Sequence, residues 1–295
     1  MRTAFAELLT AQEFLNITRD IEKRRRQNAD LVKLRYEAGR EHRGSLLSAQ
    51  ADLAQAEYDI KQAARAILLG QRRLNKQIGH THLIPVSADG TFDVVDRCSK
   101  RPDFETIADG NPFLQKLIAL TDAARYGLRS AKSDFLPQVF GNIQAGKAAV
   151  DNWPPNENEW SLGIDVGYPL FTGRSRISKV YRTRAVLNQA VADEKSGRDG
   201  VILTLEETWT NLQNALDTVG VQRKFLVAGQ ERAKIGRSQY SIGIINFDDW
   251  TILEDNLVRA RKSFLSAELA SLVAEADWIQ AQGGTLESEP VSPRP

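Results

Sequence analysis

The distribution of proline limits what this chain can fold into more than any other feature of its sequence. No proline occurs from residue 1 to 84 or from residue 170 to 289, and all ten lie between these stretches or in the C-terminal tail. A proline inside a helix removes a backbone hydrogen bond and clashes with the preceding turn, so stretches of this length without proline permit very long helices. The tail, 284–295, is polar with three prolines and is expected to be disordered.

An internal repeat relates the two proline-free stretches. A shift of 204 residues places residues 5–79 on residues 209–283 without a gap. Each copy is therefore predicted to be a helix, a tight turn at a glycine, and a second, antiparallel helix. The landmarks that coincide at the two turns are Tyr36 and Gly39 in the first copy and Tyr240 and Gly243 in the second.

A seven-residue pattern follows each turn glycine. Mostly large residues occupy one position, and small residues, mainly alanine, occupy the position three residues later. A heptad pattern predicts left-handed supercoiling against a partner helix. Small residues at one position let neighbouring backbones approach closely. By itself this periodicity favours a helical bundle or a structural coiled coil. The large positions are Leu46, Leu53, Ile60, Ile67 and Leu74 in the first copy, and Trp250, Leu257, Phe264, Ser271 and Trp278 in the second.

Between residues 137 and 171 the period changes from helical to two. Apolar residues there alternate with small or polar ones, and aromatic residues stand at both ends of the run. That pattern is typical of a membrane strand that faces lipid on one side and a polar lumen on the other. A soluble hairpin packed on one face is the alternative, and either needs a larger sheet because a two-stranded hairpin is marginally stable. The residues predicted to face lipid are Trp160, Leu162, Ile164, Val166 and Tyr168.

Taken in order, these motifs resemble the TolC-like outer membrane efflux proteins, from about residue 5 to 283. The resemblance implies a mainly α fold with long antiparallel coiled-coil hairpins in two copies, plus a transmembrane β-hairpin that contributes to a trimeric barrel. The motifs that carry it are Arg35-Tyr36-Glu37-Ala38-Gly39, Leu136-Pro137-Gln138, Trp160-x-x-Gly163 and Pro169-Leu170-Phe171-x-Gly173.

The resemblance also implies a function. It predicts a homotrimeric outer-membrane channel with a periplasmic helical tunnel, in a tripartite efflux or type I secretion system. Such a channel is a passive conduit for substrates that an inner-membrane transporter and a periplasmic adaptor deliver. A periplasmic adaptor protein and a soluble coiled-coil scaffold are the alternatives. An adaptor should have one hairpin flanked by small β domains, so two tandem hairpins and a lipid-type strand pair favour the channel.

The repeat also predicts the domain organisation. In the second copy the strands precede the long hairpin, so the matching strands of the first copy would lie before Met1. Three chains with two strands each supply fewer than the eight strands of the smallest barrels. The sequence is therefore expected to be an N-terminal truncation that also lacks a signal peptide. The expected segments are a first-copy hairpin (1–79), a linker (80–111) and a second copy (112–283), the last containing a helix (112–136), a β-hairpin (137–171) and a helical hairpin (173–283).

Acidic residues after the second turn are the candidate gate. In the family, an acidic residue six positions after this turn glycine narrows the entrance; here it is Asp249, with Asp248 beside it. A ring of such carboxylates would attract cations and repel anions. Capping of the following helix by either carboxylate is the alternative. The first copy has Ser45 at the equivalent position.

The two hairpin turns are the expected contact with the adaptor. This expectation comes from the resemblance, and an ordinary charged turn is the alternative. The residues concerned are Tyr36, Gly39, Arg40, Tyr240 and Gly243.

The remaining composition points away from an enzyme. The formal net charge of +1 gives no electrostatic reason to bind nucleic acid. Cys98 is the single cysteine, which excludes an intramolecular disulfide. His80 and His82 are interpreted as a solvated loop and the arginines at 24–26 as a solvated helix face. No nucleophile motif, phosphate-binding loop or metal-ligand spacing occurs, so no cofactor or metal is expected.

Overall fold

The computed structural model describes residues 1–80, 82, 84–92, 101–148, 157–168 and 170–284. The chain divides into a first unit, residues 1–103 with 204–295, and a second unit, residues 104–203. Most of the described residues are helical. The elements are α1 (Arg2–Glu37), α2 (Arg43–Ile78), α3 (Phe104–Asp109), α4 (Pro112–Ser133), β1 (Gln138–Ala148), β2 (Glu157–Gly167), α5 (Ser175–Ile242) and α6 (Phe247–Ala281).

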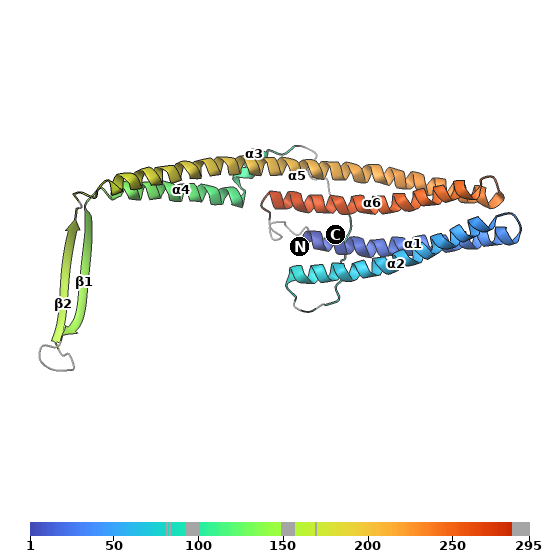
Figure 1. Cartoon of the computed structure of the whole chain (residues 1–295), viewed down its shortest axis with the longest axis horizontal. Coiled ribbons are helices and arrows are strands. Elements are labelled where there is room, and N and C mark those ends of the chain that lie inside the picture. Colours follow the sequence, from blue (N-terminus) through green and yellow to red (C-terminus); the bar gives the residue numbers. More distant parts are fainter. Residues whose placement is uncertain (81, 83, 93–100, 149–156, 169, 285–295) are drawn as a thin grey trace, which may run out of the picture. The chain divides into compact units, whose positions relative to one another are not determined.

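The first unit consists of two helical hairpins side by side. The first hairpin is α1 and α2, and the second hairpin is α6 with the part of α5 from residue 204. Helix α1 packs against both α2 and α6, and α6 packs against α5 where Gly229 and Gly236 bring the two backbones together. The helices therefore follow one another in the order α2, α1, α6, α5 (Figure 1).

The turns of the two hairpins have the same backbone structure. Gly39 has a φ of 70° and Gly243 a φ of 82°, a left-handed conformation that residues with a side chain adopt at a cost. The amide of Arg40 donates to the carbonyl of Arg35 at 2.8 Å, and the amide of Ile244 donates to the carbonyl of Gln239 at 2.9 Å. Each helix thus ends in the same glycine-dependent motif, as the repeat predicted.

Different positions of the heptad pattern are buried in the two hairpins. In α2 the small positions are buried against α1, and a Cβ added at Gly70 would lie 3.2 Å from Leu8 Cδ1. In α6 several of the large positions are buried instead, including Trp250, Leu257 and Trp278. The difference follows from the order of the helices, because α6 has a neighbour on both sides and α2 only on one.

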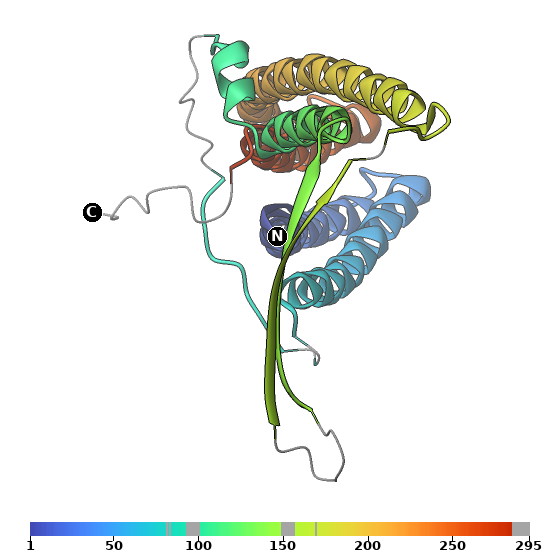
Figure 2. The same ribbon diagram turned by 90° about the vertical axis from the view of Figure 1, so that its left-hand side faces the viewer.

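The second unit contains α3, α4, the two strands and the beginning of α5. The strands form one antiparallel ribbon, in which Gln138 pairs with Gly167 and Ala148 with Glu157 (Figure 2). Directly opposite residues of an antiparallel pair point to the same face. Helix α4 ends at Ser133, three residues earlier than predicted, because the residue before Pro137 is disfavoured in a helix.

Across the described residues, no helix combines the length and the apolar character that crossing a membrane requires.

Candidate functional site

The turns of the two hairpins are joined by a buried aromatic cluster. Tyr240 is fully buried and stacks on Trp250, with ring centroids 4.3 Å apart and an interplanar angle of 9°. Phe247 meets the Tyr240 ring edge-on at 6.3 Å. We call this group the tip cluster; its buried members are Ala29, Val32, Ala49, Tyr240, Phe247 and Trp250, which come from all four helices of the first unit.

A polar network extends from the tip cluster to the first turn. The Arg35 guanidinium lies over the Tyr240 ring at 4.5 Å and donates to the Tyr240 carbonyl oxygen at 2.7 Å. The Tyr240 hydroxyl donates to Glu41 Oε2 at 2.8 Å. Ser45 Oγ donates to the other oxygen of Glu41 at 2.9 Å. These contacts connect the C-terminal end of α5 to Arg35 before Gly39 and to Glu41 after it.

The network changes the pKa values of both partners of the Tyr240–Glu41 bond. Burial raises the pKa of the Tyr240 hydroxyl, and its hydrogen bond to the Glu41 carboxylate raises it further. Burial by itself also raises the pKa of Glu41. Hydrogen bonds from Tyr240, Ser45 and the His42 backbone outweigh that effect, so the pKa of Glu41 lies below its ordinary value. At neutral pH the pair is therefore a phenol donating to a carboxylate.

Replacing Tyr240 by phenylalanine is expected to lower the free energy of unfolding by about 1.5–3 kcal/mol, the value of a hydrogen bond to a charged group. Because the pKa of Glu41 is lowered in the folded state, the stability it supplies is present above its unfolded pKa and is lost as the pH falls through its folded pKa. The difference in the free energy of unfolding between Tyr240→Phe and the unmodified protein should therefore become smaller over that acid range. Urea unfolding at several pH values measures both effects. Tyr36→Phe is the matched control, since its ring is 39 % exposed, and a loss of the same size there would contradict the assignment.

Partly buried ion pairs join α1 to α6 along the hairpins. Arg24 contacts both carboxylate oxygens of Glu254, at 3.0 and 3.1 Å, and Glu254 is only 2 % exposed. Arg25 pairs with Asp255 and, at 3.3 Å, with Asp52. The interpretation of these two arginines as a solvated face is therefore wrong. Their partners on α6 lie 230 residues away, so no local spacing in the sequence could have revealed them.

The acidic pair after the second turn lies at the surface. Asn246 caps α6, because its side chain accepts from the amide of Asp249 at 2.7 Å. Asn246 and not an aspartate is therefore the N-cap residue, which corrects the capping part of the alternative. Asp248 and Asp249 lie in the first turn of α6, where carboxylates interact favourably with the helix dipole. Both side chains are exposed, between the buried Phe247 and the buried Trp250.

The other residues predicted at the turns have contrasting positions. Tyr36 and Arg40 are exposed, and Gly39 and Gly243 form the turns themselves. Tyr240 is buried in the tip cluster, so the surface open to a partner at the second turn comes from other residues. The two tyrosines share a place in the repeat, yet only the second is covered by the neighbouring hairpin.

His80 and His82 do not belong to this site. His80 Nδ1 lies 3.0 Å from the Asn75 amide oxygen, and His82 is exposed. Within the described ranges, no group of three or more His, Cys, Asp or Glu side chains could hold a metal ion. Cys98 lies outside the described residues.

One face of the β-ribbon is apolar and exposed. The register pairs Ile143 with Leu162 and Val139 with Val166, so both strands contribute apolar side chains to the same face. The opposite face carries mainly polar and small residues, with Phe140 as an exception. A contiguous apolar face of this kind marks a surface for a partner or a membrane. The predicted residues on β2 and just after it, Trp160, Leu162, Ile164, Val166 and Tyr168, are between 54 % and 76 % exposed.

Comparisons with known proteins agree on one class. A sequence model of the outer membrane efflux protein family matches residues 105–284. The chain is 22 % identical over 173 residues to outer membrane efflux protein BepC of Brucella suis biovar 1 (strain 1330). That match covers 55 % of this chain and 36 % of the relative, so the alignment spans little more than a third of the relative's length.

Solved structures share the fold. The outer membrane protein VceC of Vibrio cholerae aligns with a TM-score of 0.79 at 18 % identity, covering 97 % of this chain and 69 % of that one. The open state of the Neisseria gonorrhoeae MtrE outer membrane channel aligns with a TM-score of 0.80 at 17 % identity, covering 96 % of this chain and 64 % of that one. At such low identities the likeness concerns the fold alone.

Proposed function

Because the chain belongs to the outer membrane efflux protein family, we propose that it is a subunit of a homotrimeric outer-membrane channel for efflux or type I secretion. In this proposal the helical hairpins form a periplasmic tunnel and the β-ribbon forms part of a barrel in the outer membrane. The channel is a passive conduit and not an enzyme. The observation that carries the proposal is the strand register, which collects the apolar side chains of both strands on one exposed face.

The ribbon has the dimensions of a membrane element. Each strand has 11 residues, and a tilted strand needs about 9–11 to cross a bilayer. The apolar face would contact lipid through Leu162 and Ile164, with Trp160 and Tyr168 at the two interfaces. In the part of the chain that the structure describes, the sheet has two strands and each has an open edge, and unpaired backbone groups are costly in lipid. Strands from further copies of the chain would pair with these edges.

The turns of the hairpins would form the periplasmic entrance. Asp249 and Asp248 are exposed beside the second turn, and in a trimer they would form a ring of carboxylates that favours cations. The tip cluster supports this arrangement, because it fixes the start of α6 against the first hairpin. Tyr36, Gly39, Arg40 and Gly243 would be open to a periplasmic adaptor, which would connect the channel to an inner-membrane transporter.

Membrane fractionation and conductance test the proposed channel together. The chain should be recovered in outer-membrane vesicles as a trimer, and the purified trimer should form conducting pores in planar bilayers. Recovery of the whole chain in the periplasmic fraction, without pores, would show that it is a scaffold or an adaptor instead.

Replacing Asp249 by alanine should reduce the cation selectivity of these pores. One carboxylate attracts a nearby cation by about 1 kcal/mol in water, which corresponds to a factor of about five in the cation-to-anion permeability ratio. Reversal potentials under a salt gradient measure this ratio. Asp277→Ala, an exposed carboxylate near the other end of α6, is the matched control. An unchanged cation-to-anion permeability ratio in Asp249→Ala would show that Asp249 does not contribute to the gate.

A further inference from the structure

Basic residues gather where the β-ribbon joins its two helices. The end of α4 (residues 129–136) and the start of α5 with the residues before it (168–182) together contain six Lys or Arg residues and a single acidic residue, Asp134. Further along α5, at residues 193–199, charges of both signs are mixed. We call the six cations the basic collar; they are Arg129, Lys132, Arg174, Arg176, Lys179 and Arg182.

The structure brings the two segments of the basic collar together. Helix α4 lies along the first part of α5, where the Thr121 hydroxyl donates to the Ala190 carbonyl oxygen at 3.2 Å. At the ribbon end of this helix pair, Arg176 Nη1 donates to the Asp134 carbonyl oxygen at 3.1 Å, and Lys179 Nζ donates to Asp134 Oδ2 at 2.6 Å. The basic collar therefore surrounds the place where α4 leads into β1 and β2 leads into α5 (Figure 1).

Most of the basic collar has no carboxylate to neutralise it. Asp134 is already engaged by Lys179. The Arg129 guanidinium lies over the Tyr126 ring at 5.6 Å, a contact that leaves its net charge in place. Like charges close together repel one another, so this surface gains from an anionic partner. Within the part of the chain that the structure describes, the collar members with no ion pair are Arg129, Lys132, Arg174 and Arg182, and all four are exposed.

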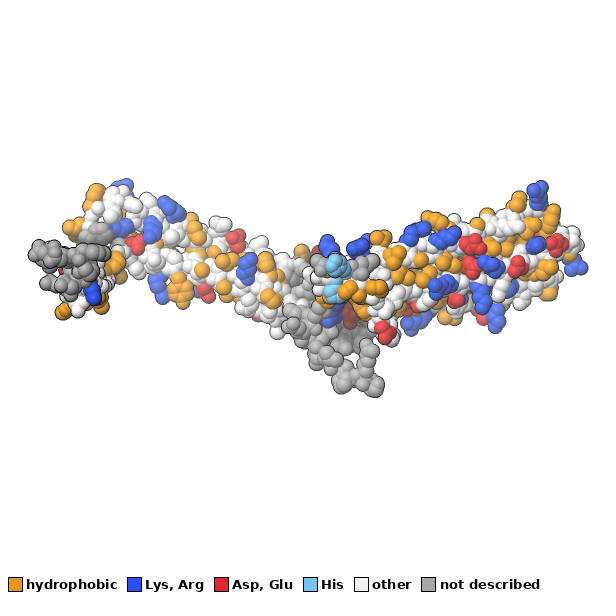
Figure 3. All heavy atoms as spheres, turned by 90° about the horizontal axis from the view of Figure 1, so that it is seen from below, with side chains coloured by type: hydrophobic (Ala, Val, Ile, Leu, Met, Phe, Trp, Pro, Cys, Tyr) orange, Lys and Arg blue, Asp and Glu red, His pale blue; other side chains and the backbone are white. Residues whose placement is uncertain are grey.

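Exposed apolar side chains lie among these cations. Leu170 and Phe171 are 88 % and 89 % exposed, and Leu136 is 61 % exposed. The Arg176 guanidinium lies over the Phe135 ring at 5.6 Å. Figure 3 shows Lys and Arg side chains beside apolar ones at the ribbon end of the molecule. A face that only meets water has no use for such apolar side chains, whereas basic and apolar residues together are typical of a surface at the membrane–water interface.

We propose that the basic collar binds the headgroups of anionic phospholipids in the membrane leaflet that faces the periplasm. The inference rests on the proposed membrane role of the β-ribbon and adds which lipid surrounds its base. Strands of 11 residues are long enough to cross the hydrocarbon, so the residues that flank them lie at the level of the headgroups. Guanidinium groups bind phosphate oxygens through two parallel hydrogen bonds. Leu170 and Phe171 would contact the acyl chains next to these headgroups.

The charges of the ribbon favour a position of the basic collar outside the lumen. Asp165 and Glu159 lie on the polar face, opposite Phe140 and Gly146, whereas Lys147 lies on the apolar face. In the proposed barrel the polar face lines the lumen, so the lumen would be acidic beside the ribbon. An anion bound within it would be repelled, but an anion held in the surrounding membrane would not.

Lipid retention tests the basic collar. Native mass spectrometry of the trimer, extracted from vesicles of phosphatidylglycerol and phosphatidylcholine in equal amounts, counts the lipids that stay bound. The unmodified protein should prefer phosphatidylglycerol. Lys132→Gln/Arg174→Gln should lower that preference about fivefold for each cation removed, the value of one cation at an anionic surface. The charge-conserving variant Lys132→Arg/Arg174→Lys should keep it, and added salt should weaken it because salt screens exposed charges.

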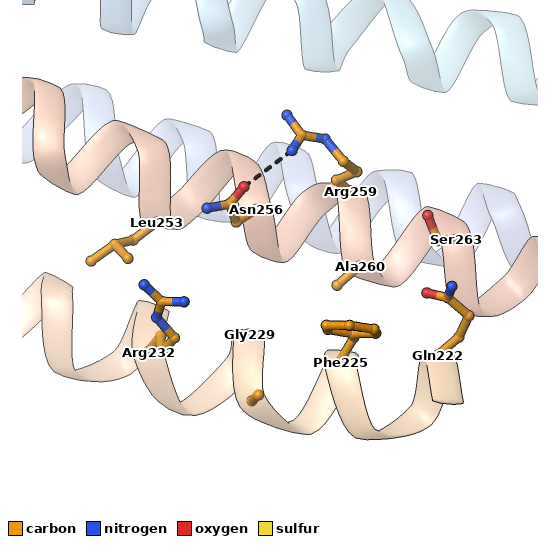
Figure 4. A pocket seen from close by; sticks show the side chains of 10 residues that line it. Gln222, Phe225, Gly229, Arg232, Leu253, Asn256, Arg259, Ala260 and Ser263 are labelled. Carbon is orange, nitrogen blue, oxygen red and sulfur yellow. Dashed lines mark hydrogen bonds between the residues drawn. The ribbon is translucent and has the colours of Figure 1, made fainter. Parts of the chain in front are cut away.

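Arg232→Gln/Lys234→Gln is the matched control. Both residues are exposed cations of α5, but they belong to the second hairpin, where Arg232 lines the groove between α5 and α6 (Figure 4). This control should retain phosphatidylglycerol as the unmodified protein does. An equal preference in the collar variant and the control would overturn the inference. A collar variant that changes the ion selectivity of the pores and not the bound lipid would place the cations in the lumen and overturn it as well.

Photo-cross-linking locates the lipid. Tyr126 is 65 % exposed beside Arg129, so a photoactivatable phenylalanine analogue at this position should attach to phospholipid in outer-membrane vesicles. The same analogue at Tyr36, beside the first hairpin turn, should attach to none. Attachment of lipopolysaccharide at Tyr126 would assign the basic collar to the other leaflet and overturn the inference. Conducting trimers without phospholipid at Tyr126 would overturn it and leave the channel intact, whereas a chain that neither enters the membrane nor forms pores would overturn the proposed function too.

Discussion

Replacing Trp250 by alanine should destabilise the first unit more than any other single change at the hairpin turns. The side chain is 1 % exposed and stacks on Tyr240, so its removal leaves a cavity where the two hairpins meet. Truncation of a buried tryptophan typically costs about 3–5 kcal/mol. Urea unfolding followed by circular dichroism at 222 nm (the helical signal) measures the loss.

Trp250→Phe tests whether the loss of stability in Trp250→Ala comes from the cavity or from any replacement at this position. Phenylalanine keeps an aromatic ring opposite Tyr240, and the buried indole nitrogen of Trp250 has no hydrogen-bond partner among the described residues. Only part of the ring volume is lost, so the cavity is smaller and the cost should be clearly below that of Trp250→Ala. Equal losses in both variants would mean that the stacking is not what stabilises the cluster.

Replacing Leu162 by lysine should prevent stable insertion of the β-ribbon. Leu162 lies in the middle of β2, on the exposed apolar face opposite Ile143. A lysine facing lipid at the midplane of a bilayer costs about 2–4 kcal/mol, and a trimer would bear this cost three times. The yield of folded trimer in outer-membrane vesicles, resolved by its resistance to unfolding in sodium dodecyl sulfate, measures the effect.

Ser161→Lys is the control for that experiment. Ser161 is adjacent in sequence but points to the other face, opposite Gln144. A lysine there would face the polar interior and keep its water, so the yield should stay near that of the unmodified protein. If Ser161→Lys were as harmful as Leu162→Lys, the two faces would not differ in environment, and the membrane role of the ribbon would be wrong.

The features that the sequence predicted are those that depend on local spacing. The turn at Gly39 needs a residue that tolerates a positive φ, and the alternation around Leu162 defines two faces of one strand. Both are properties of a few consecutive residues. The repeat then predicted that the same turn would recur at Gly243, where the backbone has the same left-handed conformation.

The features that the sequence did not predict depend on which element covers a residue. Periodicity places Arg24 on a face of α1, but only the packing of α6 shows that it pairs there with the buried Glu254. The repeat makes Tyr36 and Tyr240 equivalent, although one is exposed and the other is buried. Helix order breaks that equivalence, since a neighbouring hairpin covers the second turn within the chain and not the first.

The shared backbone of the two turns also has an evolutionary consequence. Duplication supplies two copies of a working turn, and the glycine-dependent hydrogen bonds preserve its shape whatever the surrounding side chains become. Selection can then act on each copy separately. Tyr240 is constrained by its internal contacts, and so are Arg35 and Glu41 beside the first turn, whereas the exposed Tyr36 and Arg40 can change with whatever meets them from outside. Among relatives that differ in their partners, divergence should therefore concentrate at these exposed positions of the first turn.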